Sequence, residues 1–371
     1  MHERYQIEDT SQIISPGLVV FRDLVESNLA RMVEIAGHVS RLRPHCKTHK
    51  MREVVQLQMD LGISKHKCAT LAEAEMLAQA GVQDIFLAYN IVGPNLSRAV
   101  EFVEKFSHAR LSVTADHAEP IRRLGEVMSQ SGHTVDVLLD IDTGQHRTGI
   151  VAGAAAKHLY GQIVDTAGLN PGGLHMYDGQ NHQTDINERR VAVDECWSQT
   201  MRLRDQLVSE GWSVPRIVAG GTASFPLYAE KDDPALELSP GTLVFHDAGY
   251  RDMFPDLNFV PAALILTRVI SCPRSDRVTV DLGYKACAAD DPMGSRVEFP
   301  DLLDAKQILQ DEEHLVLETA RASEFTPGDE LLAIPRHICP TSALHKQVHV
   351  VSNGKLTGRW DVAARDRWLT I

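Results

Sequence analysis

Residues 65–90 read KHKCATLAEAEMLAQAGVQDIFLAYN and carry the alternation that decides the fold. KHKCAT (65–70) and DIFLAYN (84–90) are short β-type runs, and LAEAEMLAQAG (71–81) between them has the period of an amphipathic helix. The helical pattern ends at Gly81, and glycine is the residue that most often adopts the left-handed conformation after a helix. A strand, a helix and a second strand in one stretch of this length predict a βαβ unit, and therefore a parallel sheet.

The same alternation continues on both sides of this stretch. Further β-type runs are expected at 42–48, 110–116, 136–142, 172–178, 216–222 and 236–245. Helical patterns lie between several of them, at 95–106, 120–132 and 191–211. A doubly wound sheet uses the same alternation, but eight strands within about 200–250 residues favour a barrel. We therefore expect an α/β fold with a (β/α)8 TIM-type barrel in residues 1–254, preceded by an N-terminal strand at 15–21.

The pattern changes after Phe245. Short alternating runs such as RVTVDLG, HLVLET and ELLAIP follow one another, with glycine, proline and Asp-Asp between them and almost no helical period. Such a pattern predicts an all-β domain. We place this C-terminal β domain at residues 255–371.

Composition and charge narrow the class of protein. The 371 residues are 43% apolar and 23% charged, as in globular proteins. The 37 basic and 50 acidic residues give a net charge of −13, so nucleic acid is not an expected partner. No apolar run reaches the ~18–20 residues of a membrane span, so no membrane is expected either. The six cysteines form no CxxC pair and MHERYQIEDT does not resemble a secretory signal, so we expect a cytoplasmic protein with reduced thiols.

The run RPHCKTHK (43–50) ends the first predicted strand and contains the candidate nucleophile. In a parallel barrel, reactive groups lie where strands end and loops begin. Lys47 has Arg43, His45 and His49 as close sequence neighbours, and like charge with partial burial favours the neutral, nucleophilic amine of a lysine. Such an amine can form a Schiff base with an aldehyde. The alternative is that this run is a solvated basic loop.

The run AGGTAS (219–224) follows the seventh predicted strand and is a candidate phosphate site. Gly220, Gly221 and Thr222 stand at a βα junction, where backbone N–H groups can approach a phosphate closely. The loop after the seventh strand is the usual phosphate site of this fold. An ordinary tight turn is the alternative.

Two further strand ends carry side chains suited to a cofactor or substrate. DTGQHRTG (142–149) supplies Arg147, which can bond a cofactor's ring hydroxyl or nitrogen, or can pair with an aspartate of its own strand end. HMYDGQNH (175–182) supplies the phenol of Tyr177 and the imidazoles of His175 and His182, which are suitable general acids and bases. A structural role for these histidines is the alternative.

In the predicted β domain, the run PRHICP (335–340) contains the candidate metal ligands. Residues i and i+2 of an extended segment share a face, so His337 Nε2 and Cys339 Sγ can reach one metal ion. Imidazole and thiolate together favour zinc, and two protein ligands leave positions open for water and a substrate oxygen. From spacing alone, a coincidental pair on a strand is the stronger interpretation. His314, His345 and His349 are additional candidate ligands.

Taken together, RPHCKTHK, DTGQHRTG, GGTAS, ELSPGTLVFHD, EEH and HICPT resemble, in this order, the D-threonine aldolase and D-serine dehydratase family. These are fold-type III pyridoxal-phosphate enzymes related to alanine racemases. The resemblance covers nearly the whole chain and implies pyridoxal 5'-phosphate held by Lys47. It implies these cofactor-binding residues: Lys47, Arg147, Tyr177, Gly220, Gly221 and Thr222. It implies Lys47, Tyr177 and His182 as catalytic residues, with His182 as a base, and His337 and Cys339 as metal ligands.

The metal pair separates two branches of the family that this chain resembles. The aldolases typically have His-x-Asp and prefer manganese or similar hard ions, whereas the dehydratases have His-x-Cys and use zinc. The pair His337 and Cys339 therefore implies zinc, with manganese as the alternative, and leans toward dehydration of a D-3-hydroxy amino acid to a keto acid and ammonia. Retro-aldol cleavage to glycine and an aldehyde is the alternative. The family also implies a homodimer that acts on a small D-amino acid.

Three rival interpretations remain open at this point. An amino-acid racemase would need a second base such as Tyr284, but racemisation gives no role to His337 and Cys339. A non-catalytic pyridoxal-phosphate carrier would resemble the N-terminal part but would lack the β domain. A barrel enzyme for phosphorylated sugars would use Lys47 without any cofactor.

Overall fold

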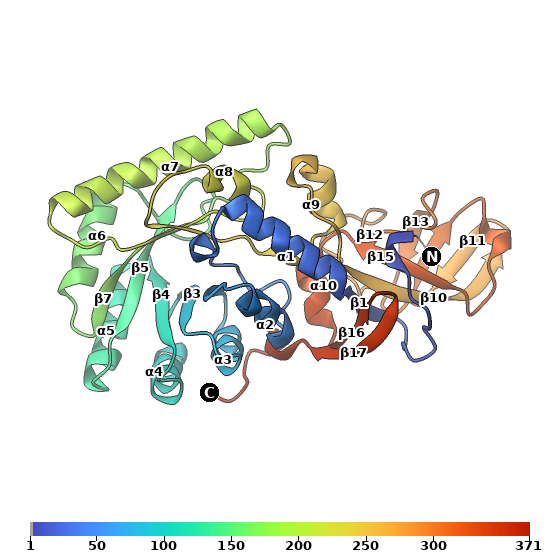
Figure 1. Ribbon diagram of the computed structural model, residues 1–371, viewed down its shortest axis with the longest axis horizontal. Coiled ribbons are helices and arrows are strands. Elements are labelled where there is room, and N and C mark those ends of the chain that lie inside the picture. Colours follow the sequence, from blue (N-terminus) through green and yellow to red (C-terminus); the bar gives the residue numbers. More distant parts are fainter. Residues whose placement is uncertain (1–2) are drawn as a thin grey trace. The chain divides into compact units, whose positions relative to one another are not determined.

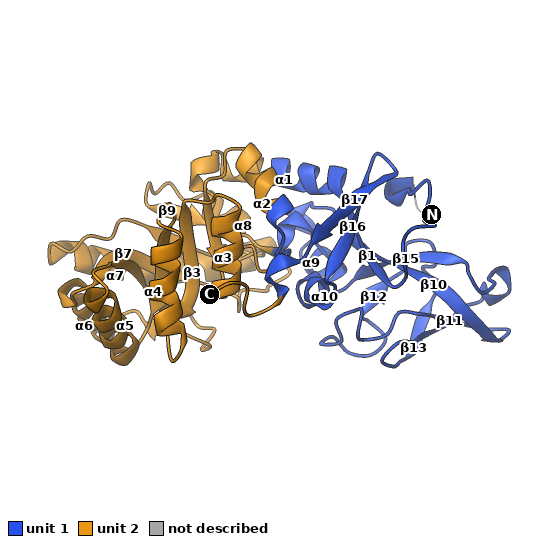
Figure 2. Cartoon of the chain, turned by 90° about the horizontal axis from the view of Figure 1, so that it is seen from below, with its two compact units in different colours: residues 1–31, 48–53, 242–365 blue, residues 32–47, 54–241, 366–371 orange. Residues whose placement is uncertain are grey.

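The computed structural model describes residues 3–371, and the chain divides into two compact units (Figures 1 and 2). Unit 2 consists of Met32–Lys47, Val54–Gly241 and Asp366–Ile371. Unit 1 consists of Thr48–Glu53, Thr242–Arg365 and the described residues up to Arg31. The division into 1–254 and 255–371 stays a prediction about folding domains. Among the described residues, no helix combines the length and the apolar character that a bilayer crossing requires.

Unit 2 is a parallel α/β barrel, so the predicted fold class is confirmed. Its sheet has the order β2-β3-β4-β5-β7-β8-β9, and β6 pairs with β5. The strands are β2 (Lys65–Cys68), β3 (Asp84–Asn90), β4 (Arg110–Ala115), β5 (Val135–Asp142), β6 (Ile150–Val151), β7 (Leu169–Met176), β8 (Ile217–Ala219) and β9 (Leu236–Leu238). Two parallel bridges, Leu42 to Leu238 and His45 to Lys67, close the ring between β9 and β2. The first predicted strand is therefore reduced to two bridges, and the last predicted strand ends at Leu238 rather than Phe245.

Helices alternate with the strands of the barrel. They are α3 (Leu71–Gln79), α4 (Asn95–Lys105), α5 (Ala118–Gln130), α6 (Ala154–Asp165), α7 (Ile186–Ser209) and α8 (Phe225–Ala229), while α1 (Arg22–Ala36) and α2 (Arg52–Asp60) begin in unit 1 and end in unit 2. Helix α3 begins where the Thr70 hydroxyl accepts the Glu73 N–H at 3.1 Å. It ends before Gly81, whose φ of +92° confirms the predicted glycine stop.

The barrel interior is layered because alternate residues of a strand share a face. On β5, Asp136 belongs to a network of ion pairs at the N-terminal ends of the strands. Two residues on, Leu138 packs in an apolar cluster with Phe86 and Val218. Two residues further, Asp140 belongs to a polar cluster at the C-terminal ends. An apolar layer therefore separates two polar ones.

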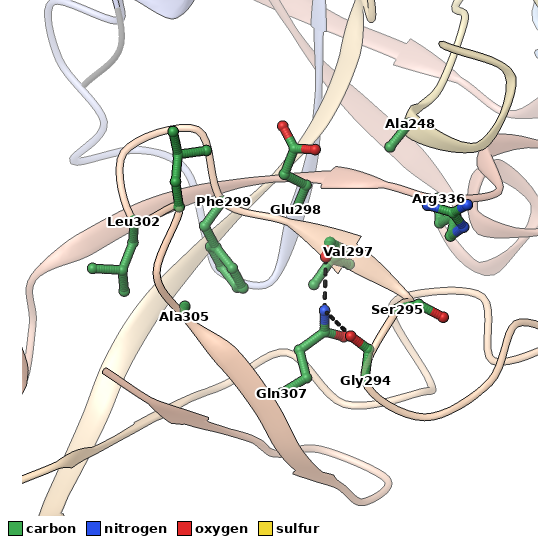
Figure 3. A pocket seen from close by; sticks show the side chains of 11 residues that line it. Ala248, Gly294, Ser295, Val297, Glu298, Phe299, Leu302, Ala305, Gln307 and Arg336 are labelled. Atoms are coloured by element: carbon green, nitrogen blue, oxygen red, sulfur yellow. Dashed lines mark hydrogen bonds between the residues drawn. The ribbon is translucent and has the colours of Figure 1, made fainter. Parts of the chain in front are cut away.

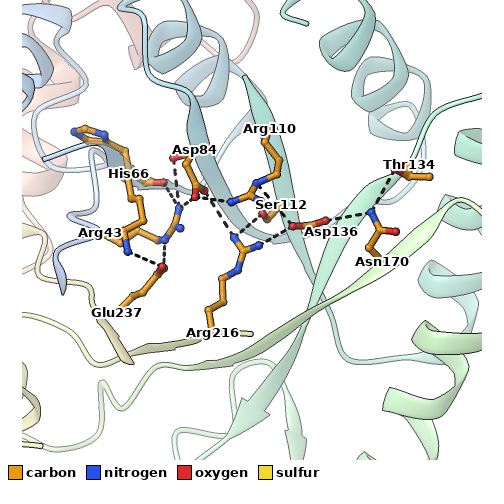
Figure 4. A network of polar contacts seen from close by, with 11 residues as sticks. Arg43, His66, Asp84, Arg110, Ser112, Thr134, Asp136, Asn170, Arg216 and Glu237 are labelled. Carbon is orange, nitrogen blue, oxygen red and sulfur yellow. Dashed lines mark hydrogen bonds and ion pairs between the residues drawn. The ribbon is translucent and has the colours of Figure 1, made fainter. Parts of the chain in front are cut away.

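Ion pairs fill the barrel at the N-terminal ends of its strands, and we call this group the basal network (Figure 4). Arg43 is fully buried and pairs with Glu237 and, at 2.8 Å, with Asp84. The other pairs are Arg110 with Asp84 at 2.9 Å, Arg216 with Asp136 at 2.6 Å and Lys65 with Glu237 at 2.8 Å. Basic and acidic groups thus face one another throughout this layer.

Unit 1 is built on a mainly antiparallel sheet of the order β13-β14-β11-β10-β1-β16-β17, with β15 pairing to β10 and β12. The strands are β1 (Gly17–Phe21), β10 (Ala263–Arg274), β11 (Arg277–Val280), β12 (Val297–Glu298), β13 (Lys306–Gln310), β14 (Leu315–Glu318), β15 (Glu330–Pro335), β16 (Gln347–Ser352) and β17 (Lys355–Asp361). Its short helices are α9 (Ala248–Met253) and α10 (Ile338–Leu344). Strand β1 pairs antiparallel with β10 and parallel with β16, so the N-terminal strand is part of this sheet. The core joins residues from both chain ends, including Tyr5, Val19, Leu264, Ile334 and Val351.

The last six residues, Asp366–Ile371, belong to unit 2 and are tied to it by polar contacts. Glu75 of α3 is fully buried, and its carboxylate accepts the backbone N–H groups of Thr370 and Ile371 at 2.8 and 3.0 Å. Arg98 of α4 donates its Nε–H to the Ile371 carbonyl oxygen at 2.9 Å. The chain therefore leaves unit 1 after Arg365 and ends in unit 2.

Candidate active site

A chain of three polar side chains crosses the C-terminal end of the barrel in unit 2. Lys67 of β2 has its Nζ 2.8 Å from His175 Nε2 on β7. His175 Nδ1 lies 2.6 Å from Asp140 Oδ1 on β5. An aspartate on Nδ1 fixes the tautomer with the proton on that nitrogen, so Nε2 accepts a hydrogen bond from Lys67. All three residues are buried.

Three basic side chains surround the ring of Tyr177, which follows β7. The amine nitrogens of Lys47 and Lys67 lie 6.0 and 5.9 Å from the ring centroid, and the Arg147 guanidinium carbon lies 4.8 Å from it. Cations over an aromatic face are attracted to its electrons, and this many together favour an anionic ligand. We call Lys47, Lys67, Arg147, Tyr177, His175 and Asp140 the upper cluster.

Burial sets the protonation of the upper cluster. Desolvation, followed by the positive charge of Lys47, lowers the pKa of Lys67 to about 7. Burial, with the charge of Lys67, also lowers the pKa of His175. Burial alone would raise the pKa of Asp140, but the contact with His175 outweighs it and the pKa is lowered. The cluster therefore holds an amine that changes its charge near neutral pH.

The run at residues 43–50 is not a solvated loop, because Arg43, Cys46, Thr48 and His49 are buried. The Cys46 N–H donates to the carbonyl oxygen of Lys67 at 2.9 Å, which holds the chain beside β2. Arg43 does not add free positive charge near Lys47 as expected, because it is paired in the basal network. The cation that acts with Lys47 is Lys67 instead.

The glycine-rich turn lies against the same tyrosine. A Cβ on Gly221 would stand 2.7 Å from the Tyr177 ring, and one on Gly220 would stand 2.7 Å from the Tyr228 ring. The Gly220 N–H donates to the Met176 carbonyl oxygen at 2.9 Å. The Gly221 N–H donates to the Ser224 hydroxyl at 3.1 Å, so both N–H groups already have partners, one on β7 and one within the turn.

A buried carboxyl supports this turn from below. Asp178 accepts hydrogen bonds from the Ser224 hydroxyl at 2.7 Å and from the Asn181 amide at 3.1 Å. Burial raises the pKa of Asp178 despite these bonds. The phosphate role of Gly220, Gly221 and Thr222 stays a prediction, since the observed role of the two glycines is to admit two aromatic rings.

The remaining side chains predicted near the cofactor have different surroundings. The alternative pairing of Arg147 with an aspartate is not observed: Asp140 is bonded to His175, and Asp142 lies 2.8 Å from His146. His182 is exposed, and its Nδ1 lies 2.9 Å from the Gly179 carbonyl oxygen. The role of His182 as a base stays a prediction.

One group of residues in unit 2 has the composition of a metal site. One ligand atom each from His45, Cys46 and Glu73 lie within 4.8 Å of one another. However, His45 Nδ1 accepts the Lys47 N–H at 3.2 Å, so the lone pair of that nitrogen is already engaged. Glu73 accepts the Ala69 N–H at 2.6 Å. The group is better explained as a hydrogen-bonded support for the Lys47 segment.

The predicted metal pair lies in unit 1 at the start of α10, and the expected strand geometry is wrong. Strand β15 ends at Pro335, His337 is the N-cap residue of α10, and Cys339 is in its first turn. The buried Asp247 carboxylate fixes this start by accepting the Ile338 N–H at 3.1 Å. The helix begins here because Asp247 satisfies one of its free N–H groups.

The side chains of His337 and Cys339 interact despite the helical backbone. Burial alone would lower the pKa of His337, but its contacts with Cys339 and then Asp290 raise it to about 9. His337 Nδ1 lies 2.5 Å from Asp290 Oδ2, and a carboxylate on Nδ1 is the usual support of a histidine that binds a metal through Nε2. The hydroxyls of Thr48 and Thr242 lie 3.1 and 3.5 Å from Cys339 Sγ.

The other candidate ligands of unit 1 lie elsewhere in its fold. His314 is exposed in the turn between β13 and β14. His345 Nε2 lies 2.8 Å from the Ala286 carbonyl oxygen, and His349 is buried on β16. None of the three is brought to the His337–Cys339 pair by a described contact.

A cavity of about 240 Å³ lies in unit 1 beside Arg336, the residue before His337 (Figure 3). Gln307 in its wall donates to the Val297 carbonyl oxygen at 2.7 Å. Glu298, also in the wall, pairs with Arg251. These polar groups are engaged with one another, and we assign no ligand to the cavity.

Lys67 and the contact of His175 with Asp140 were not predicted from the sequence. The signal was present in KHKC: Lys65 and Lys67 alternate with His66 and Cys68 on a short strand that is buried in the ring. Residues i and i+2 of such a strand point to the same side, here the barrel interior. A lysine that faces a barrel interior must be paired or must serve a function.

Comparisons with known proteins agree with this architecture. Residues 21–248 match the family model described as the alanine racemase N-terminal domain, and residues 262–351 match that of a putative serine dehydratase domain. The D-threonine aldolase of Arthrobacter sp. is 31% identical over 362 residues, which cover 96% of this chain and 93% of that protein. The D-threo-3-hydroxyaspartate dehydratase of Delftia sp. (strain HT23) is 26% identical over 352 residues, covering 89% of this chain and 92% of that protein.

A solved structure gives the same result for the fold. The crystal structure of D-threonine aldolase from Filomicrobium marinum superposes with a TM-score of 0.88 at 29% identity, covering 95% of this chain and 96% of that one. The first family model alone spans more than half of the sequence. The chain therefore belongs to the D-threonine aldolase and D-serine dehydratase family, a group of alanine-racemase-like lyases that depend on pyridoxal phosphate.

Proposed function

We propose that this lyase acts on D-3-hydroxy amino acids with pyridoxal phosphate and a divalent metal, and that it dehydrates them to a keto acid and ammonia. The observation that carries the proposal is the His337–Cys339 pair with Asp290 on His337 Nδ1. A supported imidazole beside a thiol is a donor set for zinc, and zinc makes a substrate hydroxyl a better leaving group.

The upper cluster supports the binding of pyridoxal phosphate in unit 2. Lys47 Nζ would hold its aldehyde carbon, and Tyr177 and Arg147 would bind its ring, because three cations around one phenol suit an anionic aromatic molecule. The turn at Gly220, Gly221 and Thr222 would hold its phosphate. When bound, this cofactor withdraws electrons from the bonds at the substrate Cα.

The donor set of unit 1 supports a zinc ion rather than a harder cation. His337 Nε2 and Cys339 Sγ would bind it, and Asp290 would keep the imidazole in the required tautomer. The Thr48 hydroxyl, 3.1 Å from Cys339 Sγ, would orient the thiolate. A zinc ion held by His337 and Cys339 would make the β-hydroxyl a better leaving group. Manganese is the alternative ion.

Retro-aldol cleavage to glycine and an aldehyde is the second candidate reaction. The relative from Arthrobacter, which is named for this activity, favours it. Both reactions use the same substrate class and the same residues, and they differ in whether the Cα proton or the hydroxyl proton is removed. His182 is the candidate base for the hydroxyl proton. By analogy with the family we also propose a cytoplasmic homodimer.

Product analysis separates these possibilities. Purified protein is supplied with zinc or manganese and incubated with D-serine, D-threonine or D-3-hydroxyaspartate. A 2-oxo acid with equimolar ammonia supports dehydration, whereas glycine with an aldehyde supports the second candidate. Inversion of D-alanine without metal and without lyase products would contradict both and would favour a racemase.

Two variants test the metal assignment in the same assay. Cys339→Ala and chelator treatment should each reduce lyase turnover by about 10-fold or more while the cofactor absorbance stays. Cys272→Ala, which removes an exposed cysteine elsewhere in unit 1, is the matched control and should keep full activity. Full turnover by metal-free protein would overturn the metal role.

A further inference from the structure

Lys67 is a buried lysine that the proposed function does not use. Its Nζ donates to His175 Nε2 at 2.8 Å, and His175 is held by Asp140 at 2.6 Å. The amine has an imidazole as its hydrogen-bond acceptor, whereas Lys65 on the same strand pairs with the Glu237 carboxylate. A buried lysine that is bonded to a neutral acceptor, two residues from one bonded to an anion, calls for a separate explanation.

We propose that Lys67 Nζ is the group that stores the proton moved in the lyase reaction, with His175 and Asp140 as its positioning residues. The proposal rests on the proposed function, because it assigns a proton carrier to that reaction. It applies to dehydration and to retro-aldol cleavage alike.

The position of the amine supports this role. Lys67 Nζ and Lys47 Nζ lie 5.9 and 6.0 Å from the centroid of the same Tyr177 ring, and the charge of Lys47 acts on Lys67. His175 Nε2 accepts from Lys67 because Asp140 keeps the His175 proton on Nδ1. One N–H of Lys67 therefore points to His175. The second N–H and the lone pair of the neutral amine take no part in this bond and can exchange a proton with the substrate.

The surroundings of Lys67 set its charge near neutral pH. The charged and titratable groups around it are Lys47, Arg147, Asp140 and His175, and Arg43 of the basal network has a smaller effect on it than these charges. Burial and the cations lower its pKa to about 7, while Asp140 opposes them. An amine that titrates close to the working pH both accepts and releases a proton readily.

The proton balance closes in both reactions. In dehydration, the neutral Nζ takes the Cα proton, the Cα–H electron pair becomes the new Cα–Cβ π bond, and the C–O pair leaves with the hydroxyl. The proton on Nζ then joins the departing hydroxide to form water. In retro-aldol cleavage, Nζ takes the hydroxyl proton in place of the candidate base His182, the Cα–Cβ pair remains on Cα, and Nζ returns the proton to Cα. Lys67 ends each cycle as it began.

Substitution by arginine separates proton storage from a merely structural charge. Lys67→Arg keeps a cation and a donor for His175 but cannot release a proton at neutral pH. We expect exchange of the D-alanine Cα hydrogen with D2O, and lyase turnover, to fall by about 100-fold or more. Lys67→Met should behave similarly, and thermal unfolding identifies any variant that fails to fold. Wild-type exchange, turnover and pH profile in folded Lys67→Arg would overturn the proposal.

A direct titration tests the amine without relying on activity. Protein labelled with ¹³C-lysine should show one Cε signal that titrates near pH 7, in line with the lowered pKa of Lys67 to about 7. That signal should be absent in Lys67→Met and present in Lys65→Met, the matched control from the same strand. A Lys67 signal that titrates near pH ~10, as in an unperturbed lysine, would overturn the proposal. If wild-type protein consumes no D-3-hydroxy amino acid, the proposed function fails, and the titration still reports on Lys67.

Discussion

The two ends of the barrel in unit 2 use the same kinds of side chain in opposite ways. In the basal network, every basic side chain faces at least one carboxylate, as Arg43 faces Glu237 and Asp84. In the upper cluster, Lys47, Lys67 and Arg147 gather around a phenol, and the carboxylate of Asp140 is bonded to a histidine. Paired charges hold strands in register, whereas surplus positive charge is available for a ligand.

This difference shows where function is located in a layered barrel. The N-terminal ends of the strands contribute to stability, and the C-terminal ends carry chemistry. Strand β2 contributes one lysine to each layer. Lys65 pairs with Glu237 in the basal network, and Lys67 in the upper cluster has a pKa lowered to about 7. Substitutions at the two ends should therefore have separable effects on unfolding and on turnover.

The largest effect is expected for Lys47→Ala in the upper cluster. It should remove the absorbance of the bound cofactor and reduce lyase turnover by about 1,000-fold or more, because the nucleophilic amine is lost. The free energy of unfolding should not fall, since the change relieves repulsion with Lys67. Absorbance spectra, product assays and thermal unfolding measure these quantities. Retained cofactor absorbance would mean that another amine, with Lys67 the first to examine, holds the cofactor.

At the other end of the barrel, Arg43→Met should act on stability. It leaves the buried Glu237 and the half-buried Asp84 without their main partner, and breaking a buried ion pair in this way costs about 3–5 kcal/mol. Urea unfolding measures the loss, and turnover per folded molecule should stay close to that of the wild type. Arg122→Met is the matched control: Arg122 pairs with Glu119 and Glu126 on an exposed helix, so its loss should leave the unfolding midpoint nearly unchanged.

A smaller effect should follow from acid. Burial alone would raise the pKa of Asp84, but its partners, above all Arg43, lower it to about 2, against its ordinary value of 3.8. Between these values the unfolded chain binds more protons, so the stability from Asp84 is present above pH ~4 and is lost as the pH falls toward ~2. The shift corresponds to about 2 kcal/mol. Urea unfolding at pH 5 and pH 2.5 should show a weaker pH dependence in Asp84→Asn than in wild type, and equal slopes would contradict the assignment.

The smallest effect should come from Gly221→Ala beside the upper cluster. The new methyl group would stand 2.7 Å from the Tyr177 ring, which must move. Overpacking of this kind costs about 1 kcal/mol, so we expect cofactor binding to weaken by about 5-fold. Gly153→Ala, where no atom lies within 4 Å of the added carbon, is the control. Equal cofactor affinity in both variants would show that the ring position is unimportant.

The fold was predictable because its signal is periodic. The alternation at 65–90 gives β2, α3 and β3 nearly as observed, with the helix stop at Gly81. The closing strand was not predictable in detail, since 42–48 makes only two bridges, and a polar run carries no information about ring closure. The backbone at His337 was mispredicted because a cap on α10 comes from Asp247, ninety positions away in sequence.

The site was predictable only where a motif marked it. Lys47, Arg147 and Gly221 lie around the Tyr177 ring, and their roles toward a cofactor stay predictions. Lys67 was missed because single-sequence patterns report which face of a strand a residue takes, and not which layer of a barrel it reaches. The desolvation that lowers the pKa of Lys67 exists only after β2, β5 and β7 have come together.

The backbone passes between the units after residues 31, 47, 53, 241 and 365. These crossings limit where the chain can be truncated. No single truncation point gives a fragment that contains one complete unit and nothing of the other. A fragment that stopped at residue 254 would retain β1 but would lose both of its neighbours, β10 and β16. Removal of the final six residues would leave the Glu75 carboxylate in the interior without the amides of Thr370 and Ile371. Affinity handles or fusion partners are therefore better inserted in an exposed surface loop, such as the one around Gly132, than joined to Ile371.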